Sequence, residues 1–241
     1  MYEDFAKIYD RLTFDIDYEN YQDIIKQNIK LKKGSNILEI GIGTGNMTKY
    51  FIDYAYKYLG LDPSSKMLEI ASNKLSNNSN LTLLNIGIEE LNYSEYFDFA
   101  FTTLDTINYL DSLELLKKSF TNVYNSLKKG AFFSFDLNSL NKIEKVLGNN
   151  CYIYEYENIF YTWQNFYDPI LRKVNMVLDF FIQNDGKYER ITEEQIQTYY
   201  SDEIIKKILE DIGFKNIIVK DLDTGQGVNQ TSQRILIVSQ K

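Results

Sequence analysis

Three closely spaced glycines form the part of this sequence best suited to holding a ligand. Residues 36–45 read NILEIGIGTG, an apolar run that contains Glu39 and then turns. The turn holds three glycines, Gly41, Gly43 and Gly45. Glycine is used where a backbone takes positive φ or approaches another group too closely for a Cβ. A buried strand, such a turn and then a helix present main-chain N–H groups to a polar or anionic ligand.

A carboxylate follows at the end of the next apolar run. Residues 56–62 read YKYLGLD and end at Asp62. An acidic residue at the tip of the second strand can accept hydrogen bonds from both hydroxyls of a ribose. The glycine turn and Asp62 together predict a cofactor that contains a nucleoside.

The spacing of the glycines distinguishes between nucleoside cofactors. A dinucleotide fingerprint is G-x-G-x-x-G, and Asn46 stands here in place of its third glycine. The observed pattern is E-x-G-x-G-x-G, beginning at Glu39. This pattern resembles the first motif of the class I S-adenosylmethionine-dependent methyltransferases.

Three further segments continue the resemblance in the same order along the chain. They are LDPSSKML (61–68), YFDFAFTTLDTINYL (96–110) and LKKGAFFSFDLN (127–138). The resemblance implies an α/β fold, a doubly wound, seven-stranded, mostly parallel sheet of the Rossmann-like methyltransferase type. It also implies a small-molecule methyltransferase that uses S-adenosylmethionine. The match is strong over residues 1–140 and weaker beyond them.

The resemblance assigns residues to the cofactor. Tyr9, in the segment YDRL, would face the methionine part, and the carbonyls of Thr103 and Leu104 would receive its ammonium group. Met67 would lie against the adenine. For Tyr9 and Met67, packing inside the protein is an equal alternative. The full predicted set is Tyr9, Glu39, Gly41, Gly43, Gly45, Asp62, Pro63, Met67, Gly87, Ile88 and Leu104.

The sequence departs from the family after the third strand. The usual acidic residue that accepts the adenine amino group is replaced here by Gly87. The N–H of Ile88 can still reach the adenine ring. Glu89 or Asn85 could accept from the amino group instead, with a solvent-exposed Glu89 as the simpler alternative.

Polar residues after the fourth strand stand where ligands collect in doubly wound sheets. We expect Asp105 and Tyr109 to be catalytic. We expect substrate contacts from Asn108, Tyr109, Trp163 and Tyr200. The structural alternatives are a helix cap with ordinary polar surface, and rings that fill the core of a small sheet.

Apolar periodicity and turn residues predict the remaining elements. Helices are expected over about 2–12, 18–29, 47–53, 113–127 and 202–212, with another capped by Ser64 or Ser65. Strands are expected over 56–61, 81–86, 97–103, 131–137, 216–222 and 234–240, the last of them antiparallel as the family implies.

A β-rich insert separates the fifth and sixth strands. The gap between residues 137 and 216 exceeds what one helical connection needs. Aromatic and β-branched residues alternate with polar ones, and turn residues follow at Asp168-Pro169 and Asn184-Asp185-Gly186. Three antiparallel strands are therefore expected, over 151–167, 173–183 and 187–200. We expect a single domain over 1–241 with this lobe embedded at 148–200 as a substrate lid.

Composition excludes several classes of site. Histidine is absent, which excludes Ser-His and Cys-His nucleophiles and histidine-bound zinc. A single cysteine, Cys151, excludes an internal disulfide framework, and no metal-ligand spacing occurs. The formal net charge of -8 argues against a nucleic-acid partner.

The sequence also lacks membrane and export signals. No apolar run is long enough for a transmembrane helix, and the N-terminus lacks the features of a signal peptide. A cytoplasmic protein without a membrane partner is expected. The oligomeric state stays open.

Three other functions compete with a small-molecule methyltransferase. A nicotinamide-dependent oxidoreductase is disfavoured by Asn46 and by the reversed last strand; a non-catalytic cofactor-binding relative is the second. A nucleic-acid methyltransferase is disfavoured by TLDT, which stands in place of an N/D-P-P-Y/F tetrapeptide. Because no histidine can act as a base, an amine acceptor that reacts in neutral form is weakly favoured.

Overall fold

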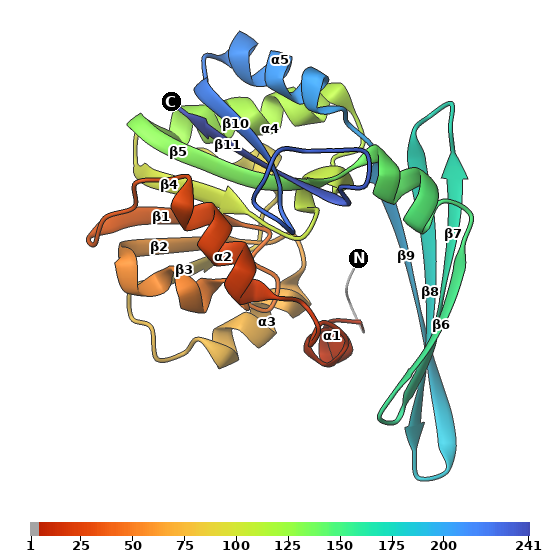
Figure 1. Cartoon of the computed structure of the whole chain (residues 1–241). Coiled ribbons are helices and arrows are strands. Elements are labelled where there is room, and N and C mark those ends of the chain that lie inside the picture. The colour runs from red at the N-terminus through yellow and green to blue at the C-terminus, as the bar shows by residue number, and fades with distance from the viewer. Residues whose placement is uncertain (1–4) are drawn as a thin grey trace.

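Two β-sheets organise the protein, described here from a computed structural model of residues 5–241. Within these residues the main sheet has seven strands: β1 (Ser35–Ile40), β2 (Ala55–Leu61), β3 (Leu81–Leu84), β4 (Phe97–Thr102), β5 (Leu127–Asn138), β10 (Lys215–Asp221) and β11 (Arg234–Gln240). The insert sheet has four in the same range: β6 (Cys151–Tyr156), β7 (Ile159–Asp168), β8 (Lys173–Asn184) and β9 (Lys187–Thr198). Figure 1 shows the insert sheet standing beside the main sheet.

The main sheet has the topology that the sequence predicts. Its strands lie in the order β3-β2-β1-β4-β5-β11-β10. Neighbours from β3 to β5 are parallel, whereas β11 runs antiparallel to both β5 and β10. The predicted fold class is therefore confirmed. One boundary differs, because β5 begins at Leu127 and not at the predicted residue 131.

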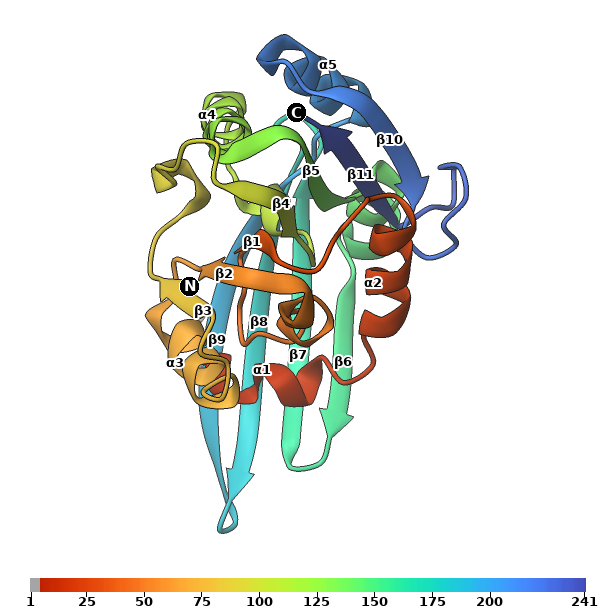
Figure 2. The same cartoon turned by 90° about the vertical axis from the view of Figure 1, so that its left-hand side faces the viewer.

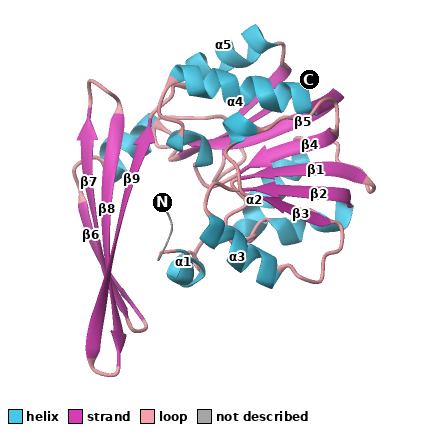
Figure 3. Cartoon of the chain, turned by 180° about the vertical axis from the view of Figure 1, so that it is seen from behind, coloured by secondary structure: helices cyan, strands magenta, loops and turns pink. Residues whose placement is uncertain are grey.

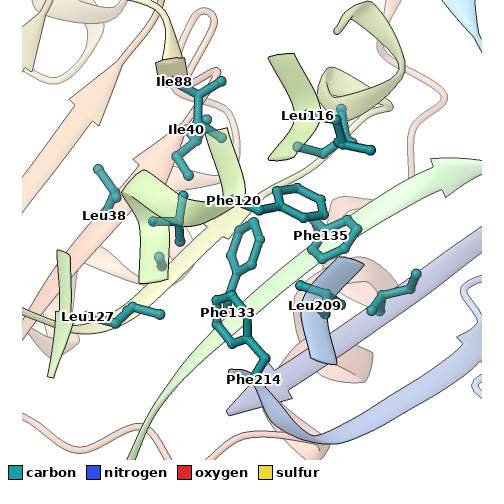
Figure 4. Close-up of a cluster of buried hydrophobic side chains, with 14 of the residues drawn as sticks. Leu38, Ile40, Ile88, Leu116, Phe120, Leu127, Phe133, Phe135, Leu209 and Phe214 are labelled. Carbon is teal, nitrogen blue, oxygen red and sulfur yellow. The ribbon is translucent and has the colours of Figure 1, made fainter. Parts of the chain in front are cut away.

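Helices cover both faces of the main sheet (Figure 1). α4 (Leu113–Ser126) and α5 (Asp202–Ile212) pack on one face, and α2 (Tyr18–Gln27) packs on the other. Successive side chains of a strand point to opposite sides of the sheet, and both sets are mostly apolar here. Each face of the sheet can therefore bury a layer of helices. The core on the α4–α5 side (Figure 4) includes Leu38, Phe120, Phe133, Phe135, Leu209 and Phe214.

The segment after the glycine turn differs from its prediction. Two consecutive 3₁₀ turns, Thr48–Tyr50 and Ile52–Tyr54, replace the helix expected over 47–53. Phe51, between them, is fully buried and packs on Phe101 with 4.6 Å between ring centroids. The chain must reach β2 at Ala55 within a few residues, and short 3₁₀ turns allow this where a longer α-helix would not.

The insert has one strand more than predicted. The segment expected as a single strand over 151–167 is the hairpin of β6 and β7, which reverses at Glu157 and Asn158. Glu157 has φ 55°, an unusual conformation for a residue with a long side chain. Arg11 holds this turn, since its guanidinium lies 2.6 Å from both Glu157 Oε2 and Asn158 Oδ1. The other two turns lie where the sequence predicts them.

The helix α1 (Ala6–Leu12) lies between the insert sheet and the rest of the protein (Figures 1 and 3). In Figure 2 it crosses in front of the strands of the insert sheet. Phe5 stacks on Phe180 of β8 at 4.9 Å between ring centroids, and Ile8 joins the same apolar core. The predicted helix began at residue 2, and residues 1–4 lie outside the described range. No helix in the described range is both long and apolar enough to cross a membrane.

Candidate functional site

A cavity of about 440 Å³ lies at the carboxyl ends of β1, β2 and β4. Its volume is in the range of small-molecule sites, and its position is where doubly wound sheets bind ligands. The lining brings together most of the predicted cofactor residues: Tyr9, Glu39, Gly41, Gly43, Asp62, Pro63, Met67, Gly87, Ile88 and Leu104. Gly45, the remaining member, is part of the same turn but is not among the lining residues of the described chain.

The glycine turn has the conformation that requires glycine. Gly41, Gly43 and Gly45 have φ values of 64°, 55° and 81°. A Cβ on Gly41 would lie 2.7 Å from Cγ2 of Thr106, which is too close for a normal contact. A Cβ on Gly43 would meet no atom within 4 Å among the described residues, so this backbone borders open cavity space. The turn can therefore bring its main chain against a ligand.

Asp62 ties the glycine turn to the end of β2. Its Oδ2 accepts the N–H of Gly43 at 2.9 Å, and its Oδ1 accepts the N–H of Ser64 at 2.8 Å. Burial raises the pKa of Asp62, and these two N–H groups partly oppose that shift. Each carboxylate oxygen has a further lone pair that a hydroxyl can use. The geometry therefore leaves Asp62 able to accept from a ribose.

Glu39 is a buried acid beneath the same turn. Its Oε2 accepts hydrogen bonds from the hydroxyls of Thr48 and Tyr58, each at 2.6 Å. Burial raises the pKa of Glu39 to about 7, against the opposing effect of these two donors. The side chain therefore changes its charge close to neutral pH.

The helix α1 is fastened to the glycine turn by Asp10. Asp10 Oδ1 accepts from the hydroxyl of Thr44 at 2.5 Å and from the amide of Asn46 at 3.0 Å. Lys74 of α3 (Ser65–Lys74) forms an ion pair with Asp10 at 2.5 Å. These contacts place Tyr9 at the cavity wall. The role of Asp10, which lies in the segment YDRL, could not be predicted from the sequence, because its hydrogen-bond and ion-pair partners come from other segments.

The wall between β3 and α4 is apolar apart from one acid. Met67 and Ile88 are buried there, and Leu110 and Leu115 complete the apolar lining. Glu89 is the acid, and it is half-buried. Flat apolar walls beside a few polar groups suit an aromatic ring such as adenine.

Asp105 lies in a buried ion-pair cluster behind the cavity. Its Oδ1 is 2.5 Å from the guanidinium of Arg234, which also contacts Asp136 Oδ2 at 2.7 Å, and Gln197 donates to its Oδ2. Burial alone would raise the pKa of Asp105, but Arg234, together with Lys142 and Gln197, outweighs burial and holds the pKa below its usual value. Asp105 is not among the cavity-lining residues of the described chain. The structure therefore separates this predicted catalytic residue from the cavity.

Three residues predicted to bind substrate take part in hydrogen bonds between residues 108–110, which follow β4, and residues 195–200, in and just after β9. The Asn108 amide donates to the carbonyl of Thr198 at 2.9 Å and accepts the N–H of Asn138 at 3.0 Å. Tyr200 donates to the carbonyl of Leu110 at 2.6 Å. Tyr109 is different because it both lines the cavity and bonds to the insert, donating to Oε1 of Gln195 on β9 at 2.7 Å. Trp163 packs in the apolar core of the insert and does not line this cavity.

The donor set of the cavity fits an adenosyl sulfonium compound. The charged side chains that line it in residues 5–241 are all acidic, Glu39, Asp62 and Glu89. An acidic cavity attracts a cationic ligand such as a sulfonium that carries an ammonium group. The described residues contain no group of three or more His, Cys, Asp or Glu that could hold a metal ion.

Comparisons with known proteins point to one family. A methyltransferase-domain family model matches residues 37–130. The crystal structure of an S-adenosylmethionine-dependent methyltransferase from Clostridium acetobutylicum ATCC 824 is 32% identical in sequence, with a TM-score of 0.87, covering 99% of this chain and 98% of that one. The candidate methyltransferase GWCH70_2453 of Geobacillus sp. (strain WCH70) is 28% identical over 245 residues, covering 100% of this chain and 99% of its own.

A more distant structure has the same fold. The sugar N-methyltransferase KedS8 from Streptoalloteichus sp. ATCC 53650 superposes with a TM-score of 0.76 at 15% sequence identity, covering 100% of this chain and 92% of that one.

Replacing Asp62 tests its predicted contact with the ribose. Asp62→Ala should weaken binding of S-adenosylhomocysteine by about tenfold or more, because hydrogen bonds to a charged group contribute roughly 1.5–3 kcal/mol. Calorimetry on the purified protein measures this change. Asp53→Ala removes an equally charged side chain from the exposed surface and should leave the affinity unchanged. An affinity of Asp62→Ala within twofold of the wild type would contradict the contact.

Glu39 should make stability depend on pH. Its pKa rises from an ordinary 4.5 to about 7 on folding, so the folded state binds the proton more tightly. The free energy of unfolding should therefore fall by roughly 3 kcal/mol as pH rises from 4.5 to 7, and level off above 7. Glu39→Gln does not titrate and should lose this fall. Urea unfolding of both proteins between pH 4.5 and 8 measures the difference, and parallel curves would refute the assignment.

Proposed function

Because this chain belongs to the class I S-adenosylmethionine-dependent methyltransferases, we propose that it methylates a small-molecule amine. The family establishes the methyl donor and the enzyme class. It also removes the nicotinamide-dependent oxidoreductase and the non-catalytic relative as alternatives. The acceptor is the part that we propose.

The observation that carries the proposal is the charge of the cavity lining. Its charged groups in the described chain are carboxylates, and no Lys or Arg of that range lines it. A carboxylate or phosphate acceptor would meet like charges there, and each such encounter is unfavourable. An amine that arrives with a positive charge is attracted instead.

Among residues 5–241, the side chains that border the cavity include no strong base. Burial raises the pKa of Tyr9 well above its usual value, so its hydroxyl stays protonated at neutral pH. Asp105 is paired with Arg234, and histidine is absent from the sequence. An amine that arrives protonated first loses one proton to water. The neutral amine then attacks through its lone pair and releases a second proton after the transfer, so no strong base is needed. Phenolic or carbon acceptors would need one.

S-adenosylmethionine supplies a methyl group already activated by its sulfonium when it is bound. The residues of this chain then act by position, which can contribute several kcal/mol to lowering a barrier. We expect the glycine turn and Asp62 to bind the methyl donor. Tyr9 and Tyr109 border the cavity on the side of α1 and the insert, where an acceptor would approach.

The embedded lobe fits a role on the acceptor side. β9 places Gln195 against Tyr109 and Gln197 against Asp105, both close to the cavity wall. These glutamines face inward on a strand whose Ile196 is exposed, the reverse of an ordinary amphipathic strand. We therefore assign residues 148–200 to substrate enclosure within a single domain. The similarity in fold to a sugar N-methyltransferase agrees with an amine acceptor.

The proposal is tested by measuring formation of S-adenosylhomocysteine with a panel of small amines, phenols and carboxylic acids. Turnover is expected with amines alone. The rate should rise with pH through the pKa of the amine and then level off, because the neutral amine is the reactive form. Turnover with phenols or carboxylic acids but with no amine would overturn the proposal. Tyr109→Phe, which cannot donate to Gln195, should lower the turnover of the amine while cofactor affinity stays within about twofold.

A further inference from the structure

We propose that the Glu89 carboxylate recognises the adenine amino group of the cofactor, replacing the acid that position 87 lacks. The inference rests on the family's cofactor and is independent of the acceptor. It concerns the apolar wall of the cavity between β3 and α4, where Glu89 is the one acidic lining residue in the described chain.

The position of the carboxylate carries the inference. A Cβ built on Gly87 would lie 2.4 Å from each carboxylate oxygen of Glu89. The Glu89 carboxylate thus lies where a side chain of residue 87 would begin. Gly87 has φ −78°, a conformation that any residue adopts, so its backbone does not require glycine. The glycine provides space for the Glu89 side chain.

Hydrogen bonds fix the backbone around Glu89, whereas the Glu89 carboxylate has no bonding partner among residues 5–241. The carbonyl of Glu89 accepts the amide of Asn122 from α4 at 2.9 Å. Glu90 caps the short 3₁₀ helix Ile88–Glu90 by accepting the N–H of Gly87 at 3.2 Å. The carboxylate of Glu89 makes no hydrogen bond or ion pair with any residue from 5 to 241. A half-buried carboxylate at a cavity wall, held by a fixed backbone, is available to a ligand.

The adjoining N–H completes a pattern that matches adenine. Ile88 is the first residue of the 3₁₀ helix, so its N–H has no acceptor within that helix. Adenine presents an amino donor beside a ring-nitrogen acceptor, which pairs with a carboxylate beside an N–H. Hypoxanthine presents a carbonyl oxygen and a ring N–H at these two places, so both contacts become repulsive.

Asn85, the other candidate acceptor, is used elsewhere. Its amide donates to the carbonyl of Asp62 at 2.9 Å, and it is exposed. It is not among the described residues that line the cavity. The choice between Glu89 and Asn85 that the sequence leaves open therefore falls on Glu89.

The experiment compares binding of S-adenosylhomocysteine with its deaminated counterpart, S-inosylhomocysteine, by calorimetry. The wild type should prefer the adenosyl ligand by roughly a hundredfold or more, as polar sites reject ligands that leave their groups unpaired. Glu89→Gln should bind the adenosyl ligand roughly tenfold more weakly and reduce the preference to about tenfold or less, because an amide can donate to a carbonyl. Glu90→Gln makes the same charge change one residue away, keeps a side-chain oxygen that can accept the N–H of Gly87, and should therefore keep the wild-type preference.

A transplanted carboxylate provides the second arm. Glu89→Ala should lose the preference for the adenosyl ligand, and adding Gly87→Asp to it should restore at least half of that preference on a logarithmic scale. A double variant that discriminates no better than Glu89→Ala would overturn the proposal. So would a Glu89→Gln variant that discriminates as the wild type does, or a Glu90→Gln variant that loses the preference equally.

Two outcomes separate this proposal from the cofactor assignment on which it rests. Wild-type protein that binds both ligands equally would refute the role of Glu89 and leave the cofactor intact. Wild-type protein that binds neither ligand would refute the cofactor assignment as well.

Discussion

The bridge that the Asp62 carboxylate forms between two main-chain N–H groups is the interaction on which the site depends. One N–H belongs to Gly43 in the turn after β1 and the other to Ser64 after β2. The bridge fixes the ends of two parallel strands relative to each other, and it orients the carboxylate at the cavity wall. Neither strand alone forms the site. Because both donors are backbone groups, the bridge depends on the path of the chain, which the glycines permit.

A second polar arrangement holds the opposite wall. Leu104 and Asp105 both have positive φ, at 58° and 56°, which is strained for residues with side chains. The ion pair of Asp105 with Arg234, and the N–H of Asp105 to Asp136 Oδ2 at 3.1 Å, hold this loop in place. Gln197 of the insert joins the same cluster. The loop that lines the cavity and the insert sheet therefore share one buried ionic anchor.

Local features were predictable from the sequence because their causes are local. The glycine turn, Asp62 and the cap at Ser64 each follow from residues a few positions apart. The hairpin turn at Asp185 and Gly186 was equally clear, since both residues take the positive φ that such a turn requires.

The contacts between distant segments could not be predicted from the sequence. Asp105 is predicted to be catalytic, and nothing near it in the sequence indicates that it pairs with Arg234, 129 residues away. Asn108 is predicted to contact the substrate, and its hydrogen bond to Thr198, 90 residues away, is equally absent from the local pattern. The turn at Glu157 has a weak sequence signal, and the contact that holds it comes from Arg11 of α1, outside the hairpin. Pairings of this kind arise only from the folded chain.

A crystal structure of the protein with S-adenosylhomocysteine would show whether Asp62 and the glycine turn hold the cofactor. We expect the ribose hydroxyls to lie within hydrogen-bonding distance of the Asp62 carboxylate, with the amino-acid part of the ligand along the turn of Gly41 and Gly43. A cavity filled by the protein's own side chains, or an Asp62 turned away from the bound ligand, would contradict this expectation.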